Sequence, residues 1–233
     1  MTVEKYIKNF KRHYHLIHVY SDKNEYKVYQ FRNQNTNKDI ILRSYLENIS
    51  IYEELVNIQC SEIPEIYDVL YLENGMIVLE EFIDGITVAQ VLESGCYKYS
   101  GAKKVIKSIC SALTILHKTN CVHRDIKPEN VMIEKTGRVV LIDFNASRKI
   151  SNSKKDTVVL GTIGYASPEQ YGITQSDTRS DIYALGVLLN VMLTGKHPSE
   201  KLAKGKAARI VRKCTCVNPD ERYQAAEKLS KAL

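Results

Sequence analysis

His123-Arg124-Asp125-Ile126-Lys127-Pro128-Glu129-Asn130 is the stretch that decides the fold, together with Asp143-Phe144-Asn145 a short distance further along the chain. Between the two, residues 131–133 and 139–142 predict short strands around a turn at Lys135-Thr136-Gly137. A carboxylate at the end of a strand and an amide just before another strand can share a hard cation through oxygen ligands. A second carboxylate beside a lysine can orient a hydroxyl group against a phosphoryl group. The stretch therefore predicts phosphoryl chemistry.

The composition is ordinary for a soluble globular protein, with 44% hydrophobic and 26% charged residues among 233. This length suits one compact unit or two small lobes. No apolar run reaches the roughly 18 residues that a membrane span requires, and residues 182–193 predict a buried helix instead. The N-terminus opens with charged residues and lacks the apolar stretch of a secretory signal. We therefore expect a cytoplasmic protein with no membrane partner.

The cysteines and the net charge exclude two further classes of site. Cys214-Thr215-Cys216 is the only close pair among the six cysteines, and it lacks the spacing of a zinc site. We expect buried thiols in a reducing cytoplasm. The net charge of +6 could favour nucleic acid, but the Lys and Arg residues are spread along the chain without an aromatic-interleaved basic motif. The charge therefore predicts a solvated surface and no nucleic-acid partner.

The order and spacing of the opening stretch resemble the catalytic loop of protein kinases, H-R-D-x-x-x-x-N, which is followed by D-F-G. The resemblance is to the eukaryotic-like (Hanks-type) serine/threonine protein kinases, in a small bacterial-style form. It implies an α+β, bilobal fold. Residues 1–83 would form a small lobe with an antiparallel sheet and one main helix, and residues 84–233 a larger, mainly helical lobe.

Local sequence patterns agree with this organisation. Alternation and turn signals between residues 14 and 82 predict five strands, with one helix at residues 47–58. Leu46, Ile49, Leu55 and Ile58 are the expected core contacts of that helix. In the second lobe, Thr87 and Ser100 are predicted to cap two helices, the second of which reaches His117.

The resemblance assigns a role to each matching residue of the catalytic loop. Asp125 would orient the substrate hydroxyl or accept its proton, and Lys127 would steady the γ-phosphate of ATP. Asn130 and Asp143 would bind Mg²⁺ against the β- and γ-phosphates. Thr162 would contact Asp125 and Lys127, and this turn favours serine or threonine over tyrosine as the acceptor in a protein substrate.

Supporting roles follow from the same resemblance. Asp181 would accept hydrogen bonds from the backbone of the catalytic loop, and Glu169 would form a buried ion pair with Arg222. Asn145 stands where the family has glycine, and asparagine tolerates left-handed backbone better than other non-glycine residues. The loop 146–163 contains candidates for phosphorylation, whose phosphate would pair with Arg124: Ser151, Ser153 and Thr157.

The small lobe departs from the family at the loop that covers the ATP phosphates, G-x-G-x-x-G-x-V. Placing Val28 at the last valine puts Ser21, Lys23 and Tyr26 at the three glycine positions. Glycine there lets backbone amides approach phosphate without a Cβ in the way. Lys23 is either an exposed turn residue or a side-chain contact to phosphate. We therefore expect weak binding of ATP.

A second departure lies on the predicted third strand, where Arg43 takes the place of the family's lysine. Arginine keeps the charge, but it is longer and planar and is not interchangeable with lysine. Glu54 would be its partner on the helix, with Glu53 as the alternative by one position. An arginine that points into solvent is the other possibility.

The predicted linker between the lobes contains the expected contacts to adenine. Glu80 takes the family's gatekeeper position, and the backbones of Glu81 and Ile83 would meet the adenine edge. We therefore predict ATP- and Mg²⁺-dependent transfer of the γ-phosphoryl group to a serine or threonine of a protein. Two alternatives stay open: a pseudokinase that acts as a nucleotide-binding or scaffolding module, and a small-molecule kinase on the same fold, since the chain after Pro198 is short for the family.

Overall fold

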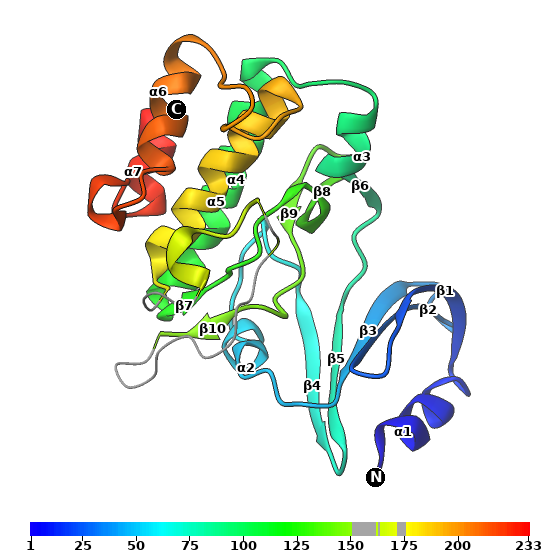
Figure 1. Ribbon diagram of the computed structural model, residues 1–233. Helices are drawn as coiled ribbons and strands as arrows, with labels where there is room; N and C mark the ends of the chain where they lie inside the picture. Colours follow the sequence, from blue (N-terminus) through cyan, green and yellow to red (C-terminus); the bar gives the residue numbers. More distant parts are fainter. Residues whose placement is uncertain (151–161, 163, 172–175) are drawn as a thin grey trace. The chain divides into compact units, whose positions relative to one another are not determined.

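A computed structural model describes residues 1–150, 162, 164–171 and 176–233 of the chain (Figure 1). Ser151, Ser153 and Thr157, the candidates for phosphorylation, lie outside these described residues. The chain divides into two compact units. The first unit comprises Met1–Gln59 with Pro64–Ile83, and the second comprises Cys60–Ile63 with Asp84–Leu233. Within the described ranges, no helix is both long and apolar enough to cross a membrane.

The first unit is built on a five-stranded antiparallel sheet with the order β1-β2-β3-β5-β4. The strands coincide closely with the predicted ones, because alternating apolar residues and turn-forming pairs specify both their length and their ends. Their bounds are β1 Tyr14–Asp22, β2 Tyr26–Asn33, β3 Asp39–Tyr45, β4 Ile66–Leu72 and β5 Gly75–Glu81.

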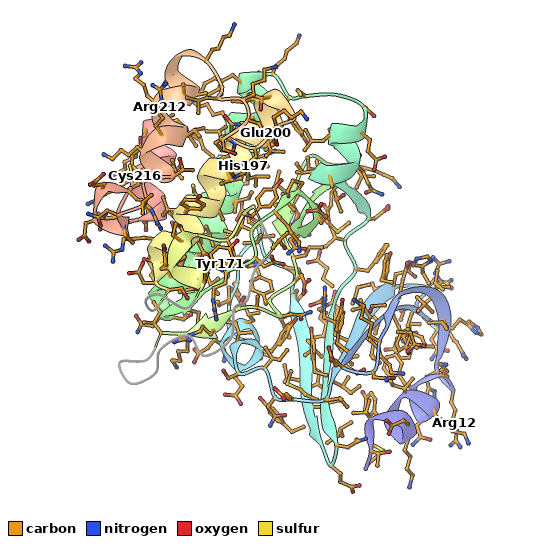
Figure 2. All side chains as sticks on the ribbon, in the orientation of Figure 1. Arg12, Tyr171, His197, Glu200, Arg212 and Cys216 are labelled. Atoms are coloured by element: carbon orange, nitrogen blue, oxygen red, sulfur yellow. The ribbon has the colours of Figure 1, made fainter. Side chains whose placement is uncertain are left out.

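One face of this sheet is covered by helix α1, Val3–Phe10 (Figure 1). Apolar residues recur at helical spacing along α1, and Phe10 stacks on Tyr14 with ring centroids 4.1 Å apart. The buried residues beneath the helix include Phe31, Leu42 and Ile77, which are fully excluded from solvent. Arg12, just beyond the helix, is exposed (Figure 2). The amphipathic pattern therefore positions α1 with its apolar side on the sheet.

The predicted helix at residues 47–58 is mostly absent, because α2 spans only Ile51–Leu55. Glu47 lies before it in a bend, Asn48 in irregular backbone and Ser50 in a turn, and the short polar side chains of Asn and Ser disfavour a helix interior. Leu46 was expected in the core and is instead 56% exposed. Tyr52, Ile51 and Leu55 supply the buried side of this short helix.

The second unit is mainly helical, so the predicted α+β class is confirmed. Thr87 caps α3 through a reciprocal capping box with Gln90, as predicted. Ser100 does not cap the next helix: α4 begins at Tyr99, after Lys98. The helices are α3 Val88–Glu93, α4 Tyr99–Lys118, α5 Thr178–Thr194, α6 Gly205–Cys214 and α7 Ala226–Ala232, with short 3-10 helices η1 Pro128–Asn130, η2 Pro168–Tyr171 and η3 Pro219–Glu221.

The central helix α5 is buried along most of its length and packs against α4 and α6 (Figure 1). Gly186 permits the close approach of α6, because a Cβ at this position would lie 2.3 Å from the Cβ of Cys214. The helix ends at Gly195, whose φ of 68° is the left-handed conformation that glycine adopts without strain. The apolar run at residues 182–193 is therefore a core helix, as predicted.

Short strands beside these helices position the catalytic loop. β6 (Gly85–Thr87), β8 (Val131–Glu134) and β9 (Val139–Leu141) form one small sheet, and β7 (Cys121–Val122) pairs with β10 (Arg148–Lys149). The catalytic loop, residues 123–130, connects β7 to β8. Asp143 follows β9. The predicted hairpin around Lys135-Thr136-Gly137 is thus confirmed, and it returns the chain from Asn130 to Asp143.

Candidate active site

The side chain of Asp181, on α5, holds the backbone of the catalytic loop in place. Its carboxylate accepts hydrogen bonds from the backbone N–H groups of His123 at 3.0 Å and Arg124 at 2.8 Å. His117 Nε2, at the end of α4, lies 2.8 Å from the same carboxylate. Burial acts to raise the pKa of Asp181, but the hydrogen bonds from the His117 side chain and the Arg124 backbone N–H favour the carboxylate, and the pKa is lowered. The predicted backbone contacts of Asp181 are confirmed.

Two residues of the site have unusual backbone conformations. Arg124 has a φ of 69° and Asp143 a φ of 66°, both in the left-handed region that non-glycine residues rarely adopt. The carbonyl oxygen of Arg124 accepts a hydrogen bond from Gln170 Nε2 at 2.9 Å. Such conformations persist only where surrounding contacts determine them, and they concentrate at functional sites.

Asp125 lies at the centre of a cluster of polar side chains. Its Oδ1 accepts a hydrogen bond from Thr162 Oγ1 at 2.7 Å, and its Oδ2 lies 2.8 Å from Lys127 Nζ. Lys127 Nζ also donates to Thr162 Oγ1 at 2.7 Å. The expected contacts of Thr162 with both residues are therefore confirmed. The hydroxyl group of Thr162 thus lies between the carboxylate of Asp125 and the ammonium of Lys127.

The electrostatics of this cluster keep Asp125 ionised. Partial burial acts to raise the pKa of Asp125, but hydrogen bonds from Lys127 and Thr162 outweigh it, so the pKa lies below its ordinary value. Next to it, burial lowers the pKa of His123, which keeps this imidazole neutral. His123 packs edge-on against Phe144 with ring centroids 5.0 Å apart. Asp125 is therefore a carboxylate at neutral pH, suited to orient a hydroxyl group.

Asn130 contacts this carboxylate, and Asp143 follows one residue after a backbone bond to Asn130. The backbone N–H of Ile142, the residue before Asp143, donates a hydrogen bond to the carbonyl oxygen of Asn130 at 2.9 Å. Asn130 is the last residue of η1. Asn130 Nδ2 donates to the Asp125 carboxylate at 2.9 Å and to the Asp125 carbonyl oxygen at 2.8 Å. This orients the amide nitrogen toward Asp125 and leaves Oδ1 as the acceptor end of the amide.

This donor set fits Mg²⁺ bound together with phosphate. Carboxylate and amide oxygens are the hard ligands that Mg²⁺ accepts, and it commonly uses one or two protein ligands with phosphates and waters. Among the described residues, no group of three His, Cys, Asp or Glu side chains could hold a metal by itself. A cation at Asn130 and Asp143 would therefore take its remaining oxygen ligands from waters or phosphates.

The segment that carries Thr162 leads into a buried ion pair. Arg222 donates from Nη1 to Glu169 Oε1 at 2.6 Å and from Nη2 to Glu169 Oε2 at 2.9 Å, as predicted. Ser180 Oγ donates to the same carboxylate at 2.8 Å. Tyr171 closes the 3-10 helix that contains Glu169 and is exposed (Figure 2). The ion pair ties this helix to the polypeptide around η3.

In the first unit, the turn between β1 and β2 is closed by its own side chains. Asp22 forms an ion pair with Lys27 at 2.7 Å and accepts a hydrogen bond from Tyr29 at 3.0 Å. The Lys23 N–H donates to the Tyr26 carbonyl at 3.1 Å, and the Lys23 ammonium lies 5.5 Å from the Tyr26 ring centroid. This turn bears an acidic side chain where the family has a glycine-rich loop.

Arg43 is buried and pairs with Glu80 on the neighbouring strand. Arg43 Nε lies 2.6 Å from Glu80 Oε1, with side chains that are 8% and 4% exposed. The alternative of an arginine pointing into solvent is therefore wrong. Glu54 is half-buried on α2, and its pairing with Arg43 stays a prediction, as do the adenine contacts of Glu81, at the end of β5, and of Ile83, which is 4% exposed.

Sequence reasoning missed two residues that support the catalytic loop, and it missed that Glu80 pairs with Arg43 within the first unit. His117 contacts Asp181, and Gln170 contacts the Arg124 carbonyl oxygen. Both contacts join residues far apart in the chain, so no local sequence pattern predicts them. Glu80 offered a signal: it is a charged residue at an otherwise apolar, inward position of β5, so it required an opposite charge on an adjacent strand. Arg43 was the charge available there.

Comparison with known proteins agrees with this geometry. Residues 17–233 match the family described as "Protein kinase domain". Serine/threonine-protein kinase D of Synechocystis sp. is 28% identical over 225 residues, which cover 86% of this chain and 44% of that protein. Serine/threonine-protein kinase PknB of Mycobacterium tuberculosis is 32% identical over 181 residues, which cover 65% of this chain and 29% of that protein.

A plant protein shows a similar degree of likeness. The calcium/calmodulin-dependent serine/threonine-protein kinase of Malus domestica is 32% identical over 167 residues, covering 70% of this chain and 38% of that protein. The chain thus spans less than half the length of these curated relatives. The match over residues 17–233 includes the whole catalytic loop, Asp143 and the Glu169–Arg222 pair. The chain belongs to the protein kinase family, and these relatives are serine/threonine kinases.

Proposed function

We propose that this chain acts in the cytoplasm and transfers the γ-phosphoryl group of ATP to a serine or threonine hydroxyl of a protein substrate. The observation that carries the proposal is the hydrogen-bonded cluster of Asp125, Lys127 and Thr162. A carboxylate and an ammonium converge within hydrogen-bond distance of one hydroxyl group, which is the arrangement that an acceptor hydroxyl and a phosphoryl group require.

Each residue has a defined part in this proposal. Asp125 orients the acceptor hydroxyl and takes up its proton as the new P–O bond forms and the bond from the γ-phosphorus to the bridging oxygen breaks, releasing ADP. Lys127 stabilises the negative charge on the phosphoryl oxygens, and Asn130 and Asp143 provide the oxygen ligands for Mg²⁺. The cation would neutralise charge on the β- and γ-phosphates when it is bound with ATP. Phosphoryl transfer demands little covalent work from the protein, so positioning and electrostatics dominate.

The first unit is proposed to contribute weak contacts to the nucleotide, because its turn between β1 and β2 lacks the glycines of the family's phosphate-binding loop. Arg43 would contact phosphate, and the backbones of Glu81 and Ile83 would contact adenine. Asp22 and its closed turn replace amide donors with a negative charge. Each hydrogen bond to a charged group contributes about 1.5–3 kcal/mol. Losing one or two of them corresponds to roughly 10–10⁴ in affinity.

The same turn favours a second candidate function, a nucleotide-binding or scaffolding module that does not transfer phosphate. In this case the residues of the second unit would bind Mg²⁺ and nucleotide, but the nucleotide would not be held firmly enough for transfer. The intact cluster around Asp125 argues for the enzyme, because a binding module has no use for a carboxylate that orients a hydroxyl group.

The deciding experiment measures transfer of radiolabelled phosphate from Mg²⁺-ATP to casein and to the chain itself. The parent is compared with Asp125→Asn, with Asp143→Asn, and with Asp68→Asn, an exposed acid in the first unit that serves as the matched control. We expect slow transfer by the parent and by Asp68→Asn, and loss of at least about 100-fold in the other two variants, because Asp125 is a positioned acid–base group and Asp143 a proposed Mg²⁺ ligand.

Thermal unfolding with and without Mg²⁺-ADP separates the two candidates. Activity that survives both Asp125→Asn and Asp143→Asn would overturn the enzymatic proposal. Stabilisation by Mg²⁺-ADP without any transfer by the parent would favour the binding module instead.

A further inference from the structure

The excess of positive charge in this chain is confined to one segment. Residues 201–213 contain six Lys and Arg residues and no Asp or Glu. The rest of the chain carries the other 27 of the 33 Lys and Arg residues against all 27 Asp and Glu residues, so it is neutral in sum. A charged surface that serves solubility has both signs interspersed. The segment is therefore a candidate surface for a negatively charged partner.

All six cations are exposed on or just before helix α6. Within α6 the exposed cations are three or four positions apart, which places them on one side of the helix. Arg212 is one of them (Figure 2). The opposite side of α6 is apolar and buried. We name the exposed surface the basic face, and it consists of Lys201, Lys204, Lys206, Arg209, Arg212 and Lys213.

The charge of the basic face is not neutralised within the described part of the chain, where none of its six residues forms an ion pair. Glu200, the acid just before the segment, pairs with Lys196 instead, at 3.5 Å. Like charges three or four positions apart destabilise a helix. Lys206 also adds a cation to the first turn of α6, where the helix dipole favours an anion. A negatively charged partner would relieve both effects.

A cavity of about 410 Å³ lies beside the first residues of the basic face. This volume is in the range of about 300–1,000 Å³ that is typical of ligand pockets. Leu193, Leu202 and Ala207 provide apolar parts of the lining. Three cations of the basic face line the same cavity, namely Lys201, Lys204 and Lys206. Apolar walls beside ammonium groups fit an apolar side chain that is flanked by carboxylates.

The loop that forms one wall of this cavity is held to α5 by a buried asparagine. Asn190 Nδ2 donates to the carbonyl oxygens of Lys196 and Lys201, each at 2.8 Å. Its Oδ1 accepts a hydrogen bond from the Ala203 backbone N–H at 2.8 Å. Asn190 itself is 0% exposed. The wall is therefore formed before a partner binds, which reduces the conformational entropy lost on association.

We propose that the basic face binds an acidic segment of a protein partner, in which Asp or Glu residues flank one apolar side chain. The apolar side chain enters the cavity, and the carboxylates pair with the cations. Single-stranded nucleic acid fits less well, because its bases stack on successive aromatic rings, and Tyr99 is the only aromatic residue among the described residues that line the cavity. An anionic membrane surface would leave the cavity empty. This binding requires neither ATP nor phosphoryl transfer.

The test measures the fluorescence anisotropy of a labelled peptide, a single leucine among glutamates, on titration with the full chain in the absence of nucleotide. The variant Lys201→Gln/Lys204→Gln/Lys206→Gln removes the three charges beside the cavity. We expect it to bind the peptide about tenfold more weakly than the parent, as for the loss of three exposed ion pairs. Added salt should weaken binding to the parent more than binding to this variant.

A second variant tests the cavity. Leu202→Ser replaces a half-buried apolar residue of the lining by a polar one. We expect it to bind the leucine peptide more weakly than the parent does. A peptide with alanine in place of leucine should bind the parent about threefold more weakly, because less apolar surface is buried. It should bind Leu202→Ser and the parent equally, since the two changes remove the same contact.

A matched control removes the same charge elsewhere on the second unit. The variant Lys104→Gln/Lys107→Gln/Lys118→Gln changes three exposed lysines of α4 and should bind the peptide as tightly as the parent. Urea unfolding distinguishes lost binding from lost folding. The lysine variant of the basic face should keep the urea midpoint of the parent, because the substitutions break no ion pair within the described residues.

The inference would be overturned by an equal loss of affinity in the α4 control, or by equal affinity of the parent for the leucine and alanine peptides. A lowered urea midpoint in the lysine variant would assign these charges to folding instead. Tighter binding of a single-stranded oligonucleotide or of phosphatidylserine vesicles would make the partner class wrong, and so would absence of peptide binding by the parent. None of these results depends on phosphoryl transfer, because no nucleotide is present.

Discussion

Replacing Glu169 by glutamine tests how strongly the buried ion pair stabilises the second unit. The substitution leaves the Arg222 guanidinium, whose side chain is 0% exposed, without its opposite charge. Arg222 keeps hydrogen bonds to the carbonyl oxygens of Cys216 at 2.8 Å, Arg179 at 3.0 Å and Val217 at 3.1 Å. Those carbonyls solvate the cation in part but do not neutralise it.

The magnitude follows from what is lost. Unit charges about 4 Å apart interact with about 4 kcal/mol at the effective dielectric of about 20 that suits protein sites. Removing one partner of a buried pair destabilises proteins by about 3–5 kcal/mol. Glutamine can accept only through one oxygen, and its amide N–H₂ would face the guanidinium. We therefore expect Glu169→Gln to lower the free energy of unfolding by about 3–5 kcal/mol.

Urea unfolding at pH 7, followed by far-ultraviolet circular dichroism, measures this difference, since the chain contains no tryptophan for fluorescence. The matched control is Glu200→Gln, which removes the same charge from an exposed pair with Lys196 at 3.5 Å (Figure 2). We expect the control to change the free energy of unfolding by less than about 0.5 kcal/mol.

A loss below about 1 kcal/mol in Glu169→Gln, or an equal loss in the Glu200→Gln control, would refute this reasoning. The double variant Glu169→Met/Arg222→Met gives a further check. Its loss should be smaller than the sum of the two single losses, because each single variant leaves one buried charge behind.

Three further predictions concern the catalytic loop. Thr162→Val removes the hydroxyl group between Asp125 and Lys127 and should slow phosphoryl transfer about tenfold or more. Thr162→Ser keeps the hydroxyl group and should retain most of the rate. Equal rates of the two variants in the radiolabel assay would contradict this prediction. Asp181→Leu leaves two buried backbone N–H groups without their acceptor and should destabilise the protein by about 2–5 kcal/mol in urea; a change under 1 kcal/mol would count against the anchoring role. The third prediction is a loss of stability in acid, seen as a fall in the urea midpoint between pH 7.5 and 3.5. Burial lowers the pKa of His123 in the folded protein, so the unfolded chain binds its proton first and stability falls below about pH 6.5. Asp125 and Asp181 also have lowered pKa values, so their contribution is present above about pH 4 and is lost as the pH falls through the folded values. A midpoint that stays constant over this range would disprove the linkage.

Local sequence determined the features that depend on neighbouring residues in the chain. Alternating apolar residues specified the five strands of the first unit, and Thr87 with Gln90 specified the start of α3. The catalytic-loop residues could be recognised because phosphoryl chemistry requires particular side chains at short, constant spacing. The contacts of Thr162 and the Glu169–Arg222 pair followed from the family resemblance and were confirmed by the geometry.

Tertiary structure decided what depends on residues far apart in the chain. The length of α2 was overestimated, because helix propensity over residues 47–58 does not reveal which side chains find a buried surface. Arg43 lies 37 positions from Glu80, and its burial and orientation arise only when β3 and β5 pair in one register. His117 meets Asp181 in the same way, through the packing of α4 on α5. The sequence by itself determined which chemical groups the chain brings to its catalytic loop. Only the folded chain determined which buried charged groups pair with each other. A buried charge needs an oppositely charged group close to it in the folded structure, and that group can be far away in the sequence.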